Sequence, residues 1–241
     1  MKKNFRHYKR EGKKPVAGFW NKEYQYAQNL ALSDNPSEDL IKFTRWLIRE
    51  SGQRVLHKHN SVLDLGAGNG RNLIYLAKEF GMNGVGYDIA REAINQALTN
   101  SKGLDLTYQV RSIAEPLPLA TASQALVLDM MTSHFLTTPE RAKVLNEIVR
   151  VLKSGGYLFI KTFLLDEDEH AKRLLREHPA DEPGSYIHPK IGVAEHAFNE
   201  RELIDLLAPH FTIHKIVKSH RHLIRGRPAK RRSICVYGQL H

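Results

Sequence analysis

The sequence predicts an α/β protein in which a mostly parallel sheet is covered by helices on both faces. Three observations support this prediction. From residue 61 onward, short apolar segments alternate with segments of helical periodicity, as expected when a crossover helix follows each strand. A glycine-rich turn over residues 66–70 joins the first apolar segment directly to a helical segment. The continuous apolar stretch 125–131 is typical of a central strand that is buried on both faces.

The N-terminal part differs in composition from the rest of the chain. Residues 1–18 are basic and interrupted by glycine and proline, so we expect a flexible arm there. Asn35 is a good N-cap, Pro36 suits the first helical position, and Glu38 is placed to reach back to the cap amide. We therefore expect a helix from about residue 36 and assign residues 19–56 to an N-terminal helical cap.

The remaining elements follow from periodicity and capping signals, and we assign residues 57–241 to one domain. Glycine after a helical segment predicts its end, and a Ser, Thr or Asn followed by an acid predicts a start. Residues 166–197 break the rhythm with three prolines and four histidines, so we expect a lid or substrate-binding insertion there. The expected strands are 61–65, 84–87, 104–110, 125–131, 157–163, 211–218 and 233–240, and the expected helices are 71–80, 92–100, one from 138 and one from 199.

Composition excludes several classes of protein. The single cysteine, Cys235, can form neither an internal disulfide nor a Cys-based zinc site, and it favours a reducing compartment. The basic start is not followed by an apolar run, so we expect no signal peptide. No stretch approaches the ~18 apolar residues of a membrane span. We expect a cytoplasmic protein.

The net charge of +10 lies mostly in two short segments. Residues 1–14 hold seven Lys and Arg with one acid, and residues 221–232 hold six with none, so the rest of the chain is near neutral. Basic clusters suit phosphate-rich partners or anionic substrates, but charge runs are also common on solvated surfaces. Both interpretations stay open at this point.

The segment that carries the chemistry runs from Asp64 to Gly70. A strand leads into a turn with glycine at 66, 68 and 70, which is a G-x-G-x-G spacing rather than the G-x-G-x-x-G of dinucleotide-binding proteins. An acid two residues before the first glycine repels a pyrophosphate but can receive a cationic, amino-acid-like ligand. Asp88 ends the next strand, where a carboxylate can accept hydrogen bonds from both hydroxyls of a ribose.

These segments resemble the class I S-adenosylmethionine (SAM)-dependent methyltransferases, most closely the small ubiquinone- and tellurite-resistance-type members. Residues 64–70 match the family's first motif, Asp88 its ribose acid, 112–118 its adenine segment, 128–131 the strand under SAM, and 150–156 the loop before the fifth strand. The resemblance implies a Rossmann-like, mostly parallel seven-stranded sheet with an antiparallel C-terminal strand. The cofactor residues it implies are Asp64, Leu65, Gly66, Ala67, Gly68, Asn69, Gly70, Asp88, Ile89, Ile113, Ala114, Asp129 and Met130.

Two positions depart from the family pattern. Ile113 stands where the family often has an Asp that contacts the adenine amine. Adenine would then rely on the Ala114 amide and on apolar stacking by Ile89 and Ile113. Gln124-Ala125 replaces a common Phe-Asp before the fourth strand. Neither change removes the expected cofactor site.

The acceptor of the methyl group is harder to predict, because SAM supplies the activated methyl and the protein mainly positions the acceptor. The fourth strand runs into His134 without the Asp/Asn-Pro-Pro-aromatic sequence that amine methylases of DNA and RNA carry there. His134, Tyr24 and Tyr186 are the catalytic candidates, each with a plain structural role as its alternative. The lid histidines have irregular spacing and no cysteine joins them, so we expect no metal.

The two basic segments are expected at the same edge of the sheet as SAM. If strand 211–218 runs parallel to the core, the following loop emerges at the carboxyl ends of the strands, where ligands bind. We therefore expect a small-molecule acceptor first, and an RNA or ribosome-associated acceptor second, contacted through 1–14 and 221–232. A catalytically inactive basic module that binds nucleic acid is the alternative from a different functional class.

Overall fold

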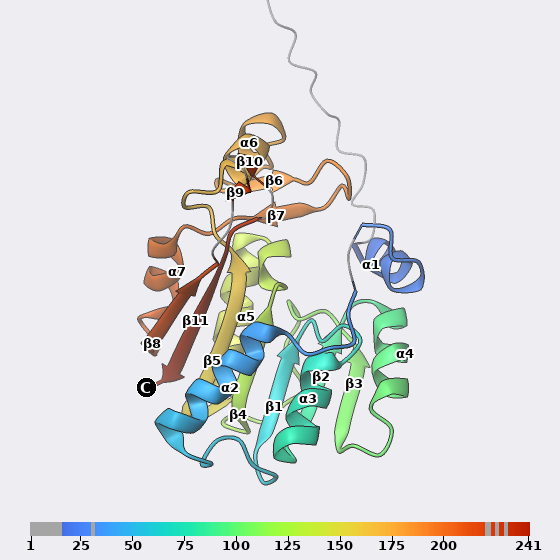
Figure 1. Ribbon diagram of the computed structural model, residues 1–241, viewed down its shortest axis with the longest axis vertical. Coiled ribbons are helices and arrows are strands. Elements are labelled where there is room, and N and C mark those ends of the chain that lie inside the picture. Colours follow the sequence, from blue (N-terminus) through green and yellow to red (C-terminus); the bar gives the residue numbers. More distant parts are fainter. Residues whose placement is uncertain (1–15, 30–31, 220–222, 225–226, 229–230) are drawn as a thin grey trace, which may run out of the picture.

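The computed structural model describes residues 16–29, 32–219, 223–224, 227–228 and 231–241. Its main sheet has seven strands in the order β3-β2-β1-β4-β5-β11-β8 (Figure 1). The strands β1 to β5 pair in parallel, and β11 is antiparallel to both of its neighbours. The strands are β1 (Ser61–Leu65), β2 (Asn83–Asp88), β3 (Leu106–Val110), β4 (Gln124–Met130), β5 (Leu152–Phe163), β8 (Phe211–Lys218) and β11 (Ser233–Leu240).

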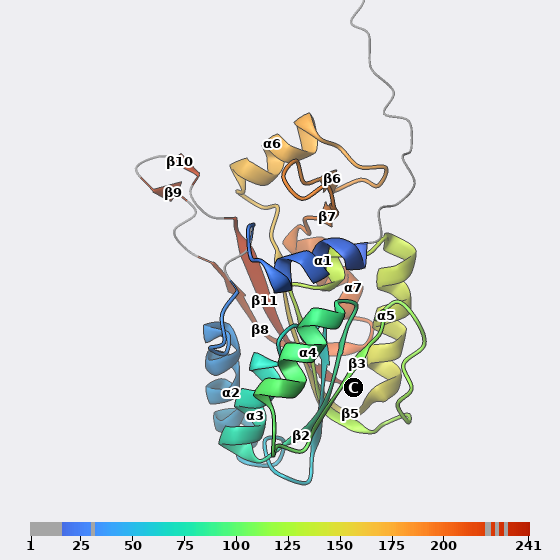
Figure 2. The same ribbon diagram turned by 90° about the vertical axis from the view of Figure 1, so that its right-hand side faces the viewer.

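Helices cover both faces of this sheet (Figure 2). Leu40, Phe43 and Leu47 are buried against one face together with side chains of α3 and α4. Val144 and Ile148 of α5 are buried against the other face with side chains of α7. The helices are α1 (Val16–Gln25), α2 (Glu38–Ser51), α3 (Arg71–Phe80), α4 (Arg91–Asn100), α5 (Thr138–Val151), α6 (Glu169–Glu177) and α7 (Glu200–Leu207), with a short 3-10 turn η1 (Ser133–Phe135).

The insertion between β5 and α7 stands above the carboxyl ends of the parallel strands (Figure 1). It consists of α6 and a two-stranded antiparallel sheet, β6 (Ser185–Ile187) and β7 (Ala194–His196). A second small sheet pairs β9 (Leu223–Ile224) with β10 (Arg227–Pro228). We call residues 166–197 the lid. Within the described ranges, no helix is long and apolar enough to cross a membrane.

Most of the predicted elements are confirmed, including the parallel direction of β8 relative to the core. The N-terminal region differs in two ways. Residues 16–18, expected in the arm, belong to α1, a helix for which no capping signal was recognised. The second helix begins at Glu38 with Ser37 as N-cap, so the assignment of Asn35 as N-cap was wrong.

Tertiary contacts explain the late start of α2. The Ser37 amide donates to Asn72 Oδ1 at 3.1 Å, and Asn69 Nδ2 donates to the Ser33 carbonyl at 3.2 Å and to Asp34 Oδ1 at 2.9 Å. The backbone just before α2 is thereby bound to the glycine turn and the start of α3. A local N-cap contributes ~1 kcal/mol. The three tertiary hydrogen bonds together contribute more, so they determine where α2 begins.

Candidate active site

The glycine turn joins β1 to α3 at the carboxyl edge of the sheet. The amides of Gly66 and Ala67 donate to the Tyr87 carbonyl at 2.8 and 2.9 Å, which holds the turn against the end of β2. Gly66 has a φ of 75°, and a Cβ there would overlap the Thr132 side chain. Gly68 has a φ of 56°, and a Cβ there would overlap the Tyr24 hydroxyl. Glycine is required here because other residues both strain this backbone and fill the space above it.

Three carboxylates end the strands around this turn, and all three have raised pKa values. Burial, and next the charge of Asp88, raises the pKa of Asp64 to about 7. Burial raises the pKa of Asp129 to about 6 and also raises that of Asp88. Asp64 is 1% exposed, and its Oδ2 has no hydrogen-bond partner among the described residues. Such an arrangement favours a ligand with positive charge, because the ligand would stabilise the ionised carboxylates.

Asp88 is held so that its oxygens face the turn. Its Oδ2 accepts from the Gly68 amide at 2.9 Å, and its Oδ1 accepts from the Ala90 amide at 2.8 Å. Each carboxylate oxygen has a second lone pair, so Asp88 keeps the capacity to accept from two hydroxyls. Ile89 follows it directly, and Ile113 and Ala114 line a cavity of about 210 Å³. These residues lie at the neighbouring ends of β2 and β3, as the adenosine-binding prediction requires.

The remaining predicted cofactor residues have additional structural roles. Asp129 accepts from the Ser133 amide at 3.1 Å and from the Ser133 hydroxyl, so its carboxylate orders the chain after β4. Met130 Sδ accepts from Asn72 Nδ2 at 3.5 Å. The side chain of Asn69 binds residues 33 and 34, as described above, so only its backbone faces the turn. Leu65, Ala67 and Gly70 are buried within the turn and the strand before it.

Helix α1 closes over the turn from the side of α4 (Figure 2). Asn21 Oδ1 accepts from the Glu92 amide at 3.0 Å, and the Tyr24 carbonyl accepts from Gln96 Nε2 at 2.7 Å. The Tyr24 hydroxyl lies over Gly68, and burial followed by the charge of Asp88 raises its pKa. Tyr26 is 73% exposed and takes no part in this closure. The neutral phenol of Tyr24 is therefore placed to contact a ligand in the turn.

His134 lies in η1, directly after the β4 edge, and is 1% exposed. Its ring contacts Phe135 at a centroid distance of 4.0 Å and Phe163 at 4.9 Å. Neither ring nitrogen has a hydrogen-bond partner in the described part of the chain. Burial, followed by the charges of Arg231 and His196, lowers the pKa of His134 to about 3. The imidazole is therefore neutral and only weakly basic in this environment, and the catalytic role of His134 stays a prediction.

Tyr186 lies inside the lid rather than at an open edge. It is fully buried, its hydroxyl donates to Glu195, and Arg231 Nη1 contacts that same hydroxyl. Arg231 Nε also donates to Asp168 Oδ2 at 3.0 Å. These contacts connect the lid to the chain that enters β11, so the structure places Tyr186 in a structural network.

The lid histidine His196 is also part of a hydrogen-bonded network. Its Nδ1 lies 2.9 Å from the Ser185 hydroxyl, and its Nε2 lies 2.8 Å from Glu202 Oε1 on α7. Both ring nitrogens are thus engaged by the protein. Among the residues that the structure describes, no group of three potential ligands could hold a metal ion.

The basic segment 221–232 is only partly described. Arg231 is bound to Asp168 and Tyr186, and Arg232 Nη1 pairs with Glu167 Oε2 at 2.6 Å. These two arginines therefore connect parts of this chain, a role that no sequence pattern indicated. Residues 1–14, Arg221, Arg225 and Lys230 lie outside the described residues, and the side chain of Arg227 is not described.

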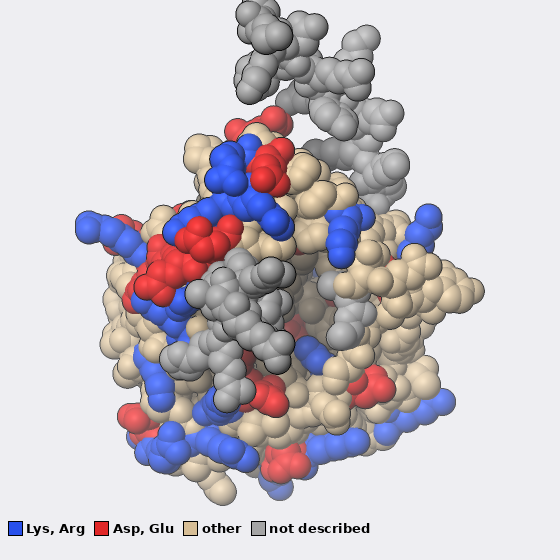
Figure 3. All heavy atoms as spheres, turned by 45° about the horizontal axis from the view of Figure 1, so that its top comes forward, with Lys and Arg blue, Asp and Glu red and all other residues tan. Residues whose placement is uncertain are grey.

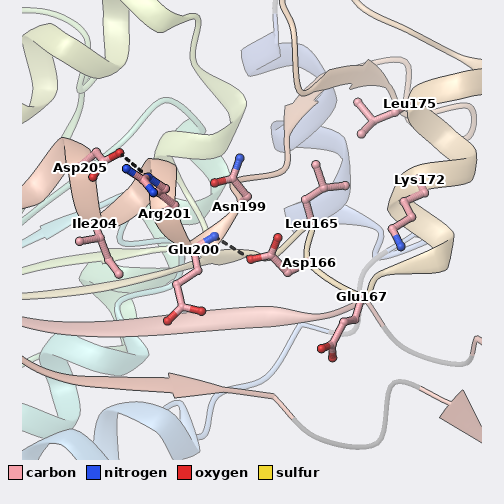
Figure 4. Close-up of a pocket in the computed structure, with 10 residues that line it drawn as sticks. All are labelled: Leu165, Asp166, Glu167, Lys172, Leu175, Asn199, Glu200, Arg201, Ile204 and Asp205. Atoms are coloured by element: carbon pink, nitrogen blue, oxygen red, sulfur yellow. Dashed lines mark hydrogen bonds and ion pairs between the residues drawn. The ribbon is translucent and has the colours of Figure 1, made fainter.

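A cavity of about 1060 Å³ lies away from the glycine turn, between α6 and α7 (Figure 4). Its charged side chains are engaged within the chain: Arg201 lies 3.5 Å from Asp205, and Lys172 lies 2.8 Å from Glu169. No histidine or cysteine lines it. The carboxyl edge of the sheet is also hollowed, beneath the lid and beside α1 (Figure 3). The buried acids lie at this edge, which makes it the better candidate site.

The residues around the turn fit SAM by their chemistry. Asp64 offers an unpartnered buried oxygen to a cationic amino-acid group, and Asp88 offers acceptors to ribose hydroxyls. The absence of side chains at Gly66 and Gly68 lets the Thr132 side chain and the Tyr24 hydroxyl approach the turn closely, so Tyr24 covers it from α1. At the expected adenine end, Ile113 is buried and the Ala114 amide donates to the Ser112 hydroxyl at 3.2 Å.

Comparison with known proteins supports the same conclusion. Residues 62–156 match a family model described as a methyltransferase domain. The chain is 31% identical over 198 residues to phthiotriol/phenolphthiotriol dimycocerosates methyltransferase 1 of Mycobacterium ulcerans, covering 76% of this chain and 66% of that protein. It is 29% identical over 134 residues to a glycine/sarcosine/dimethylglycine N-methyltransferase of Actinopolyspora halophila, covering 53% and 23%.

A solved structure has a similar arrangement over most of this chain. The crystal structure of a SAM-dependent methyltransferase from Methanosarcina mazei has a TM-score of 0.65 and 26% identity, and the match covers 78% of this chain and 95% of that one. Both curated relatives extend beyond the matched region, since the match spans 66% of the first and 23% of the second. The similarity therefore extends over a common domain.

Proposed function

The chain belongs to the class I SAM-dependent methyltransferases, and from that premise we propose that it transfers the methyl group of SAM to a small-molecule acceptor. The observation that carries the proposal is the unpartnered Asp64 oxygen, buried beside Asp88 at a G-x-G-x-G turn. A buried carboxylate without a partner is costly, and a cationic ligand removes that cost. SAM is the family's cofactor.

Each residue around the turn has a separate role in this proposal. SAM supplies a methyl group activated by a sulfonium, so the protein's contribution is mainly orientation. Asp64 holds the cationic amino-acid part, and Asp88 fixes the ribose. Asp129 orders residues 131–134 through Ser133, which sets the edge that the acceptor approaches. Tyr24 closes the site over Gly68 and excludes water.

His134 is not proposed as the proton acceptor at neutral pH. Its low pKa makes it a poor base, and its burial against Phe135 and Phe163 favours a role in shaping the acceptor side. Tyr186 is proposed as a structural residue of the lid. An acceptor that is itself nucleophilic would need no protein base, because the sulfonium is already activated.

A small-molecule acceptor is favoured over RNA by what the described arginines do. Arg231 and Arg232 bind carboxylates of this chain, so they are not available for phosphates. A second candidate, an RNA acceptor, rests on the basic residues at 1–14 and 221–230.

The test is transfer of radiolabelled methyl from SAM into a size-fractionated cell extract. We expect label in the small-molecule fraction with the wild-type chain and none with Asp64→Asn. Label in the RNA fraction would favour the second candidate. Absence of any transfer, together with no SAM binding by calorimetry, would contradict the proposal itself.

A further inference from the structure

A continuous row of rings crosses the edge of the sheet beside the glycine turn. Trp20 of α1 contacts Phe135 at a centroid distance of 5.0 Å, and Phe135 contacts His134 at 4.0 Å. His134 contacts Phe163 at 4.9 Å, and the guanidinium carbon of Arg231 lies 4.2 Å from the centre of the Phe163 ring. Four separate parts of the chain supply these side chains: α1, η1, the end of β5, and the segment before β11. We call these five side chains the ring row.

The ring row lies next to the site of methyl transfer. His134 of the row follows Thr132 by two residues, and the Thr132 side chain fills the space above Gly66. Trp20, Phe135 and Phe163 are half-buried, so part of each residue is exposed. His134 lies beneath them with both ring nitrogens unpartnered among the described residues. The row therefore combines open aromatic surface with a buried polar group that lacks a partner.

The ring row carries no unopposed charge. Its one cation, Arg231, lies against two buried carboxylates, with 3.0 Å from Nε to Asp168 and 3.5 Å from Nη1 to Glu195. A phosphate or carboxylate placed here would meet these acids. A flat neutral ring instead gains from offset stacking on aromatic side chains and on a guanidinium plane.

We propose that the ring row is the acceptor subsite and that it binds a flat, uncharged aryl group whose polar atom pairs with His134. This inference rests on the proposed function, because it names the acceptor class for the same site. The rings stand at angles of 40° to 71° to one another and so border the acceptor with both faces and edges, and neutral His134 carries one nitrogen donor and one nitrogen acceptor for its hydroxyl or amine. Reacting atoms need such restricted orientation for an in-line transfer.

The test compares two bicyclic alcohols, 2-naphthol and decahydro-2-naphthol. They share a carbon skeleton and a hydroxyl, but only the first is flat and aromatic. Each is titrated by calorimetry into the full chain, with and without saturating S-adenosylhomocysteine. We expect 2-naphthol to bind about tenfold more tightly, which corresponds to the upper range for an aromatic pair. Equal affinities for the two alcohols would overturn the proposal.

Two variants locate the binding. We expect Phe163→Leu to weaken 2-naphthol about tenfold, since it removes the central ring of the row. Tyr26→Leu removes an exposed ring outside the row and should change the affinity less than about twofold. Both variants should keep the affinity for S-adenosylhomocysteine, which also reports that they are folded. An unchanged 2-naphthol affinity in Phe163→Leu would contradict the subsite.

The same titrations separate this inference from the proposed function. Failure of S-adenosylhomocysteine to bind would count against the methyltransferase proposal, and the titrations without it would still decide the ring row. Normal binding of S-adenosylhomocysteine with no preference for 2-naphthol would overturn the subsite alone. An oligouridylate that binds more tightly than 2-naphthol, with a steep loss as salt rises, would also overturn it in favour of RNA.

Discussion

The two halves of the hollow edge are built in different ways. The cofactor half consists of Asp64, the glycine turn and Asp88, which lie within 25 consecutive residues of the chain. The acceptor half brings Trp20, Phe163 and Arg231 together from three distant segments. The first half is acidic, whereas the second is aromatic and pairs its one cation with two buried carboxylates. The difference indicates that cofactor recognition is local in sequence, while acceptor recognition depends on how the lid and α1 are assembled.

The largest expected effect comes from breaking the assembly of the acceptor half. Arg231→Met leaves Asp168 and Glu195 buried without their cation, and loss of one partner of a buried pair costs about 3 kcal/mol or more. Urea denaturation should show this loss in the free energy of unfolding. Arg201→Met is the matched control: its side chain is 89% exposed, so we expect a change below about 0.5 kcal/mol. A stability equal to wild type in Arg231→Met would show that the lid is held by other contacts.

The next effect concerns the cofactor half alone. Asp88→Ala removes the carboxylate that binds the Gly68 amide and is proposed to hold the ribose. We expect a loss of about 1–3 kcal/mol in SAM affinity by calorimetry, the range for unpairing buried polar groups. Asp181→Ala, at an exposed lid position, serves as the control. An unchanged dissociation constant in Asp88→Ala would refute the ribose assignment.

The pH dependence of SAM binding tests whether the acidic cofactor half binds a cationic ligand through Asp64. Because the pKa of Asp64 is raised to about 7, its ionised form is gained only as the pH rises toward 7. A cationic ligand prefers that form, so affinity should increase up to tenfold per pH unit below 7, or about 1.4 kcal/mol, and level off above it. In Asp64→Asn the rise in affinity just below pH 7 should be lost, and only the part due to Asp88 and Asp129 should remain. A pH-independent affinity in the wild type would contradict the pairing with Asp64.

The raised pKa of Asp64 also predicts how the stability of the ligand-free protein depends on pH. A carboxyl whose folded-state pKa exceeds its unfolded value binds its proton more tightly when folded. Asp64 therefore destabilises the fold progressively as the pH rises from about 4 to 7. Denaturation of the ligand-free chain should show this decline, and saturating SAM should reduce it. Asp64→Asn should lose this part of the pH dependence.

The smallest effect is expected for the basic segment. Arg225→Ala combined with Arg227→Ala should change methyl transfer less than about twofold, because the acceptor contacts proposed here are ring contacts. Raising salt from 50 to 200 mM should likewise have little effect, whereas an acceptor held through several phosphates loses orders of magnitude. Steep salt dependence that disappears in the double variant would move the acceptor toward RNA.

The cofactor half could be predicted from the sequence because strand, turn, helix and Asp88 form a local pattern. Strand β1 and helix α3 begin and end where periodicity and Gly81 predict. The existence of β8 and β11 was predicted from the sequence, and their antiparallel arrangement was implied by the resemblance to the family.

The acceptor half could not be predicted in the same way. Nothing in the sequence indicates that Arg231 meets Asp168, since that contact depends on the register that pairs Ser233 with Phe163. The low basicity of His134 follows from its burial beside Phe135 of the same turn and Phe163 of β5, which a position at the end of a strand does not reveal. The early helix α1 was missed because its only signal was a run of aromatic residues, and its stability comes from contacts with α4.

One measurement tests the division of the edge most directly. It is the dissociation constant of S-adenosylhomocysteine, measured by calorimetry side by side for Asp88→Ala and Phe163→Leu, with transfer of labelled methyl from SAM followed in the same preparations. The account predicts that Asp88→Ala weakens binding by ~10-fold or more, and that Phe163→Leu keeps the wild-type constant while methyl transfer falls. A loss of cofactor affinity in Phe163→Leu as large as that in Asp88→Ala would contradict two separate halves.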